Sequence, residues 1–187
     1  MNYNLKILRS NRKTLGLEIR SSNEVLIRAP YRLSQGEINQ ILTEQKSWIE
    51  KKLREMEHRE AIRNGIKPFT EEEIYTLAQK ALEYIPKRVE YYAKKIGVTY
   101  GRITIRNQKT RWGSCSSKGN LNFNCLLMLT PPETIDSVVV HELCHRKHMN
   151  HSPAFYKEVY KAYPDYEIHH HWLKEHGLTL LAKCFGE

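Results

Sequence analysis

The chain of 187 residues lacks a long apolar run, which excludes the classes of protein that enter a bilayer. No segment approaches the roughly 20 consecutive apolar residues that a membrane-spanning helix needs. The first residues, MNYNLKILRSNRK, also lack the apolar core of a secretory signal peptide. The sequence therefore predicts a protein that neither spans a membrane nor is secreted, with length enough for one sizeable core and a small module.

Cysteines are few, and their spacing forms no pairing pattern. The chain holds four, none of them in a CxxC arrangement: Cys115, Cys125, Cys144 and Cys184. A disulfide framework would need a denser and more regular spacing. We therefore expect free, mostly buried thiols and a reducing, cytoplasmic location.

Acidic residues are absent from one long stretch. The formal net charge is +9, and residues 91–132 contain seven basic side chains and no Asp or Glu. The seven are Lys94, Lys95, Arg102, Arg106, Lys109, Arg111 and Lys118. Such a stretch predicts a positive surface that would attract acidic proteins or phosphate groups, including those of nucleic acids. A basic surface without a dedicated partner is an equally good interpretation.

A β-prone region followed by a helix opens the chain. Three short stretches are rich in strand-forming residues and are separated by turn signals: residues 4–9, 14–20 and 24–28. A capping box of Ser34 and Glu37 then starts a long helix whose apolar residues fall on one face. We expect an N-terminal module of a β-hairpin plus a helix over residues 1–64.

A linker and a larger domain follow this module. Residues 61–69, AIRNGIKPF, are typical of a linker. Thr70 opens a second capping box and a second long helix, in which Pro86 should produce a kink and Gly97 the end. A second, larger domain is therefore expected over residues 65–187.

Two strands and a capped helix complete the predicted order of elements. The strands are expected at residues 101–106 and 121–128, on either side of a polar loop. Pro131 stands early in the first turn of a further helix, which runs through IDSVVVHELCHRKH. The predicted chain thus combines strands with helices.

The last of these helices carries HELCH, a motif with the spacing of a metal site. His141 and His145 are four residues apart, so on a helix they lie on one face and can bind one ion. Glu142 follows the first histidine, where a carboxylate can reach a water on the metal without itself being a ligand. The pattern indicates hydrolysis by an activated water, with Glu142 as the general base.

A metal site that keeps one position open for water needs a third protein ligand. His148 returns to the same helical face, but three ligands along one straight helix would approach the ion almost in a line. His151 stands at a predicted corner, where residues 149–150 end the helix and residues 152–153 start another. We favour His151 as the third ligand over His148. The remaining alternatives are Glu158, Glu167 and His171.

Several motifs together carry a likeness to a known family: RWGSC, LNFN, HELCHRKHMNHSPAF, and PDY before WLKEHG. With them, nearly the whole chain resembles the YgjP-like metallopeptidases, relatives of the SprT-like and WLM (Wss1-like) zinc proteases. The resemblance implies a zincin-like α+β fold and a Zn²⁺ ion bound by His141, His145 and His151. It also implies that Glu142 is the general base.

The resemblance further gives the LNFN strand a role in binding substrate. In zincins a strand above the metal pairs with an extended peptide through backbone hydrogen bonds. Alternation along the predicted strand separates one set of side chains from Asn122 and Asn124: Leu121, Phe123, Cys125 and Leu127. By itself this pattern indicates only a half-buried strand. The resemblance implies an edge strand in which Asn122, Phe123 and Asn124 bind substrate, while Arg111 and Trp112 either steer substrate or anchor their loop.

The sequence as a whole predicts a zinc-dependent metallopeptidase that hydrolyses peptide bonds in a protein or peptide substrate. An alternative hypothesis is a nucleic-acid-associated protein whose metal site is structural or weakly active. The acid-free stretch motivates it, as do SprT-type relatives that digest proteins attached to DNA. A third hypothesis is a latent peptidase that residues 1–64 inhibit.

Overall fold

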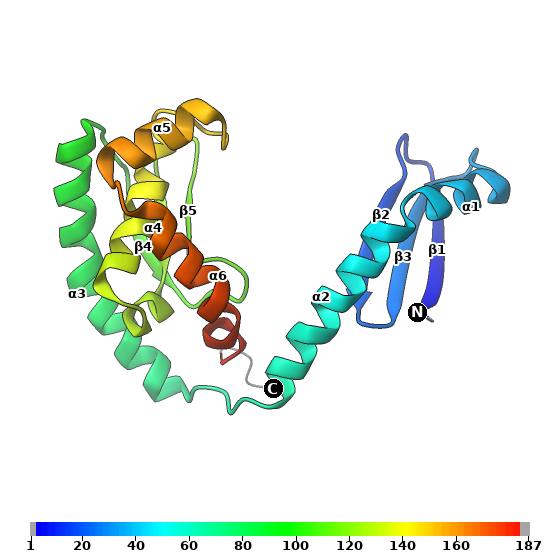
Figure 1. Cartoon of the computed structure of the whole chain (residues 1–187), viewed down its shortest axis with the longest axis horizontal. Helices are drawn as coiled ribbons and strands as arrows, with labels where there is room; N and C mark the ends of the chain where they lie inside the picture. Colours follow the sequence, from blue (N-terminus) through cyan, green and yellow to red (C-terminus); the bar gives the residue numbers. More distant parts are fainter. Residues whose placement is uncertain (1–2, 184–187) are drawn as a thin grey trace. The chain divides into compact units, whose positions relative to one another are not determined.

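The computed structural model describes residues 3–183, which form two compact units, one up to Gly65 and one from Ile66 onward (Figure 1). Both units combine helices and strands, which confirms the predicted α+β class. No helix within the described residues has both the length and the apolarity that crossing a bilayer requires. A domain boundary between residues 64 and 65 remains a prediction.

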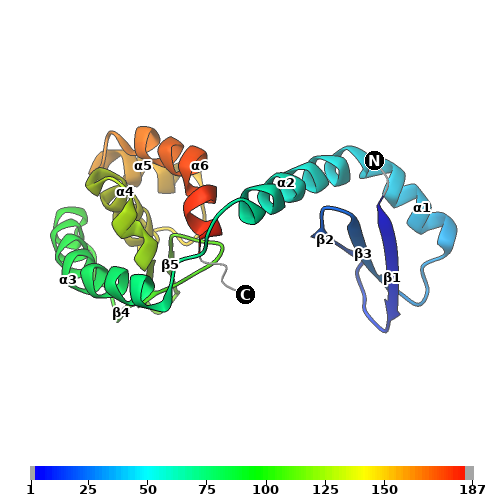
Figure 2. The same cartoon turned by 90° about the horizontal axis from the view of Figure 1, so that it is seen from below.

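The first unit is a three-stranded sheet with two helices on one face (Figure 2). Its elements are β1 (Asn4–Ser10), β2 (Gly16–Ser21), β3 (Glu24–Pro30), α1 (Gln35–Glu44) and α2 (Lys46–Asn64). The strand order is β1-β3-β2, with β1 parallel and β2 antiparallel to β3. Alternate residues of β3, Val25, Ile27 and Ala29, are buried in the small cores beneath the helices. The predicted strands and hairpin are therefore present.

The helix predicted from Ser34 is in fact two helices. The capping box of Ser34 and Glu37 is present, but α1 ends at Glu44, and Gln45 separates it from α2. The Gln45 N–H is shared between the carbonyls of Ile41 and Thr43, a local tightening at the end of α1. Residues 61–64 were predicted as linker and are helical, because nothing stops the helix before Gly65.

The second unit places a central helix, α4, between α3 and α6 (Figures 1 and 2). Its elements are α3 (Glu71–Ile96), β4 (Ile103–Arg106), β5 (Gly113–Cys115), β6 (Leu121–Asn124), η1 (Cys125–Leu129), α4 (Pro132–Cys144), α5 (Pro153–Ala162) and α6 (Tyr166–Ala182). Almost every residue of α4 is buried, so this helix is the centre of the unit's core. Of the predicted free thiols, Cys125 and Cys144 are buried and Cys115 is half-buried, whereas Cys184 lies outside the described residues.

Local signals define the ends of α3 as the sequence predicts. The Thr70 side chain accepts from the Glu73 N–H and the Glu73 carboxylate accepts from the Thr70 N–H, so the capping box is complete. Gly97 ends the helix in the left-handed conformation, with φ of 75°. The helix continues through Pro86 as one element. A long, well-capped helix thus lies against one side of α4.

The strand predicted over residues 121–128 ends at Asn124, and residues 125–129 form a 3₁₀ helix instead. The side chain of Asn124 accepts a hydrogen bond from the Leu126 N–H and so turns the backbone out of the strand. The predicted edge position is also wrong. The sheet order is β4-β6-β5, so β6 is the central strand, parallel to β4 and antiparallel to β5.

A mostly buried ion pair fastens α3 to α4. Arg88 donates two hydrogen bonds to the Asp136 carboxylate, at 2.7 and 2.6 Å. The Tyr92 hydroxyl donates a third to the same carboxylate, at 3.1 Å. Bidentate pairing of a guanidinium with a carboxylate fixes geometry as well as contributing energy. The pair sets the position of α4 relative to α3.

Asp136→Ala would leave the Arg88 guanidinium and the Tyr92 hydroxyl without their acceptor. We expect a loss of roughly 2 to 3 kcal/mol in the free energy of opening α3 and α4, because removing one partner of a buried pair strands the other. Hydrogen exchange of the amides in these two helices, measured on the full chain, would report it. Lys87→Ala, which removes an exposed pair with Glu83, should change that free energy by less than about 0.5 kcal/mol. Equal effects of the two substitutions would contradict the assignment.

Candidate metal centre

The two histidines of HELCH lie at the C-terminal end of α4. His141 is in its last turn, and His145 is its C-terminal cap, with a backbone that is still helical. The four-residue spacing therefore places both rings on one face, as predicted. The helix ends at Cys144 rather than at residues 149–150, and a tight turn follows it. His148 consequently lies beyond the helix and not on its face.

The corner predicted at His151 is present. Ser152 caps α5 through a hydrogen bond from the Phe155 N–H, and Pro153 occupies the first turn. His151 precedes this cap and returns toward α4. Its Nε2 atom lies 3.0 Å from Nε2 of His141. The change of chain direction brings a third imidazole to the two on α4.

The ligand atoms of His141, His145 and His151 lie within 4.8 Å of one another. Two nitrogens bound to a tetrahedral zinc ion would be about 3.3 Å apart, given Zn–N bonds of about 2.0–2.1 Å. Three imidazoles are also a donor set that suits zinc and leaves a fourth position free. The residues present therefore fit a metal ion of this kind, and His148 is not part of the cluster.

Hydrogen bonds at the far side of the rings select the nitrogen that faces the cluster. Nδ1 of His145 lies 3.0 Å from the carbonyl oxygen of His148, so this nitrogen carries the proton and donates it. Nδ1 of His141 lies 2.9 Å from the Tyr166 hydroxyl. Protonation at Nδ1 leaves the Nε2 lone pair for a metal, which is the usual role of such supporting hydrogen bonds.

Burial favours the neutral form of the two histidines on α4. It lowers the pKa of His141 to about 3, with smaller contributions from His145 and His151, and it lowers the pKa of His145 as well. Phe155 packs against all three rings, with centroid distances of 4.9, 4.6 and 5.0 Å to His141, His145 and His151. Neutral imidazole is the form that binds metal, so this apolar support favours ligation.

Glu142 is a buried carboxyl beside the cluster. The residue is 6 % exposed, and no other group within residues 3–183 makes a hydrogen bond to its carboxyl oxygens. Burial raises the pKa of Glu142 to about 8, while the charge of Arg111 acts in the opposite direction. Glu142 and His141 both line a pocket of about 160 Å³. A carboxyl in this environment can hold a proton near neutral pH.

Gly113 of β5 leaves the space that the Glu142 side chain occupies. A Cβ atom at this position would lie 2.7 Å from both Cγ and Oε1 of Glu142. Real Cβ atoms do not approach other atoms so closely, so any larger residue would displace the glutamate or the strand. The glycine of RWGSC is therefore required by the position of the carboxyl.

The remaining candidates for the third ligand each have another partner. Glu158 accepts from Lys147, Glu167 accepts from Tyr160, and His171 pairs with Glu175. None of these three belongs to the histidine cluster.

The three predicted substrate residues of β6 lie on a central strand, and their role in binding substrate remains a prediction. Phe123 and Asn124 are 0 % exposed, and Asn122 bonds to Ser114 of the neighbouring strand. The Asn124 amide donates to the carbonyls of Gln108 and Arg111, at 2.7 and 3.0 Å, and so anchors the loop before β5. Alternation along the strand predicts which side chains share a face of the sheet, but it does not predict whether the strand is central or at an edge. As an edge strand for substrate, β6 is excluded by its two bonded neighbours.

Three further residues shape the site and were not singled out from the sequence: Phe155, Tyr166 and His170. Tyr166 is 2 % exposed and bonds to His141, and His170 lines the pocket. Trp112, predicted only as a steering or anchoring residue, also lines this pocket. The four-residue spacing between Tyr166, the tyrosine of PDY, and His170 is a signal that could have pointed to a shared helix face.

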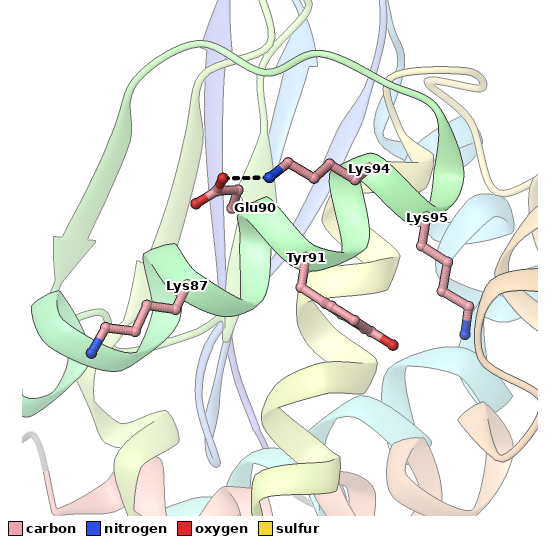
Figure 3. Close-up of a pocket in the computed structure, with 5 residues that line it drawn as sticks. All are labelled: Lys87, Glu90, Tyr91, Lys94 and Lys95. Carbon is pink, nitrogen blue, oxygen red and sulfur yellow. Dashed lines mark hydrogen bonds and ion pairs between the residues drawn. The ribbon is translucent and has the colours of Figure 1, made fainter.

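A larger hollow, of about 750 Å³, lies on the exposed side of α3 (Figure 3). It is lined by Lys87, Glu90, Tyr91, Lys94 and Lys95. Its side chains spread along one helix instead of converging, and Lys94 pairs with Glu90 at 2.7 Å. We assign no chemistry to it.

Gly113→Ala should affect the activity of the site without affecting its metal binding. The added methyl group would displace the Glu142 carboxyl but would not touch the three histidines, so metal content should stay near that of the wild type. Any activity that depends on Glu142 should fall by about 10²-fold or more, because small misplacements of a reacting group are costly. Metal analysis and a peptidase assay on the same preparation test this. An unchanged rate would show that the carboxyl position is not critical.

The chain was compared with protein families, with curated proteins and with solved structures. The family model described as YgjP-like, metallopeptidase domain, matches residues 13–80 and 69–176. No curated protein matches the chain. Two solved structures are similar in part: the metallopeptidase zymogens abylysin of Pyrococcus abyssi and jannalysin of Methanocaldococcus jannaschii.

The abylysin zymogen is 22% identical with a TM-score of 0.44, and the match covers 49% of this chain and 93% of that one. The jannalysin zymogen is 23% identical with a TM-score of 0.41, and the match covers 49% and 95%. The two family matches together extend over most of the sequence, including β5, the HELCH helix and the His151 corner. The chain therefore belongs to the YgjP-like family of metallopeptidases.

Proposed function

We propose that this metallopeptidase is zinc-dependent, with His141, His145 and His151 as the metal ligands and Glu142 as the general base. The observation that carries the proposal is the convergence of three imidazole ligand atoms within 4.8 Å beside a buried carboxyl. Protonation of His145 and His141 at Nδ1 leaves Nε2 of each for the ion. The substrate would be a protein or peptide.

When bound, a zinc ion acts as a Lewis acid that polarises a carbonyl group and lowers the pKa of water to about 7. Glu142 takes a proton from the attacking water and later delivers it to the nitrogen of the leaving amine. The raised pKa of Glu142 suits the second transfer, because a proton taken from water is then held long enough to be passed on. A positive charge nearby favours the carboxylate form that the first transfer needs.

The strand that would bind an extended substrate is β5 rather than β6. In its antiparallel ladder with β6, Trp112 accepts from the Asn124 N–H and Ser116 donates to the Asn120 carbonyl. Hydrogen-bonded pairs alternate along such a ladder, so Ser114 also faces β6, whereas Gly113 and Cys115 direct their backbone groups to the open edge. Gly113 lies against Glu142. A peptide pairing there would pass next to the proposed base.

Two finer hypotheses receive no added support. A nucleic-acid-associated role depends on the acid-free stretch, but the exposed Lys94 within it pairs with Glu90, four residues before. A relationship to the SprT-like and WLM proteases remains a hypothesis based on motif likeness. The proposed peptidase function depends on neither of these two hypotheses.

Glu142→Gln removes the base but keeps the shape of the side chain. We expect hydrolysis of casein to fall by about 10² to 10⁴-fold, the usual contribution of a general base, while zinc content stays at one ion per chain. Elemental analysis of the purified chain and the protease assay provide both readouts. Glu175→Gln, on the exposed side of α6, is the matched control and should leave the rate unchanged. Full activity of Glu142→Gln would refute the mechanism.

A further inference from the structure

A chain of hydrogen-bonding groups runs from the histidine cluster to the wall of the pocket. The Tyr166 hydroxyl lies 2.9 Å from Nδ1 of His141 and 3.4 Å from Nδ1 of His170. The Tyr166 ring also stacks on His170, with a centroid distance of 5.2 Å and an angle of 15°. The two residues are four apart on α6 and share a face of that helix. One buried phenol thus contacts both histidines.

The direction of these hydrogen bonds follows from the state of His141. An imidazole that gives its Nε2 lone pair to a metal carries its proton on Nδ1. That N–H donates to the Tyr166 oxygen, which leaves the phenol proton to be donated elsewhere. The acceptor within reach is Nδ1 of His170. A neutral His170 whose Nδ1 accepts must carry its own proton on Nε2.

His170 is part of the wall of the pocket that also contains Glu142. Both residues line the same space of about 160 Å³, together with His141 and Trp112. Nε2 and Nδ1 lie on either side of Cε1 in the ring, so the Tyr166 hydroxyl that contacts Nδ1 leaves Nε2 without a hydrogen bond. Within residues 3–183 no group accepts a hydrogen bond from Nε2 of His170. The pocket wall thus includes a residue whose Nε2–H has no acceptor among residues 3–183.

We propose that His170 is a catalytic residue that donates a hydrogen bond from Nε2 to the carbonyl oxygen of the scissile peptide bond, and that Tyr166 is the positioning residue that holds His170 in this tautomer. The inference rests on the proposed function, because it requires a metal on His141 and a peptide in the pocket. No bond is formed or broken by His170. A fixed donor aimed at an oxygen that gains negative charge stabilises the transition state more than the substrate.

The first experiment tests Tyr166 through metal binding, not activity. Tyr166→Phe keeps the ring and removes the hydroxyl that accepts from His141. The affinity of the full chain for Zn²⁺, measured by competition with a chromogenic chelator, should fall about 10 to 100-fold. Tyr160→Phe is the matched control, since its hydroxyl bonds to Glu167 on an exposed part of the molecule, and its affinity should stay within about twofold of the wild type. Equal affinities of Tyr166→Phe and wild type would overturn the positioning role.

The second experiment tests His170 through turnover. His170→Asn keeps an acceptor near the Tyr166 hydroxyl and removes the Nε2–H donor. We expect kcat on a fluorogenic peptide to fall about 10² to 10³-fold, as for the loss of one oxyanion donor, with the Zn²⁺ affinity unchanged. His171→Asn, the neighbouring residue in an exposed pair with Glu175, should retain the wild-type kcat.

The outcomes separate the inference from the function on which it rests. If His170→Asn turned over as fast as His171→Asn, or lost its zinc together with its activity, the catalytic role of His170 would be overturned. If the wild type bound no zinc, or if Glu142→Gln were fully active, the proposed function would fail first. Thermal melting of each variant without metal identifies any variant that has lost its fold. If His170→Asn does not fold, the zinc affinity of Tyr166→Phe still tests the hydrogen bond between Tyr166 and His141.

Discussion

Three imidazole nitrogens have to meet at one point, and the second half of the chain is arranged around that requirement. A single helix can supply two of them, because residues four apart share a face. The third needs another direction, which the chain provides by ending α4 at Cys144 and restarting at Pro153. Phe155, in the first turn of the restarted helix, then packs against all three rings. The convergence of the three rings thus depends on where a helix stops as well as on which side chains it carries.

The same geometry depends on burial that is unfavourable without partners. His141 and Glu142 leave water, and neither would be charged readily in that environment. Two supporting hydrogen bonds satisfy the far nitrogens of two rings: Nδ1 of His141 donates to the Tyr166 hydroxyl, and Nδ1 of His145 donates to the His148 carbonyl. Among the described residues Glu142 has no such partner, which leaves its carboxyl available for proton transfer. The hydrogen-bonded imidazoles therefore have fixed positions, whereas the Glu142 carboxyl can exchange a proton.

The parts of the fold that could be predicted are those set by neighbours in sequence. The capping boxes at Ser34 and Thr70 and the left-handed Gly97 depend on contacts within a few residues, and all three are present. The His151 corner was found in the same way, from a serine and proline that restart a helix. The central position of β6 is different, because it depends on pairing with β4 on one side and with β5 on the other. No local pattern in LNFN states which strands flank it, and the helical turn after Asn124 came from a side-chain cap that alternation does not reveal. Gly113 and Tyr166 belong to the site for a similar reason, since they meet Glu142 and His141 only through packing of separate elements.

The amide of Asn124 connects the pocket to the interior of the molecule. It is fully buried on the central strand, and it holds the carbonyls of Gln108 and Arg111 in the loop that leads to Trp112. A wall attached in this way moves only as far as the core allows, unlike a loop held by surface contacts. A peptide that binds at this wall would then meet a rigid, preformed surface. The peptide, and not the wall, would have to change conformation on binding.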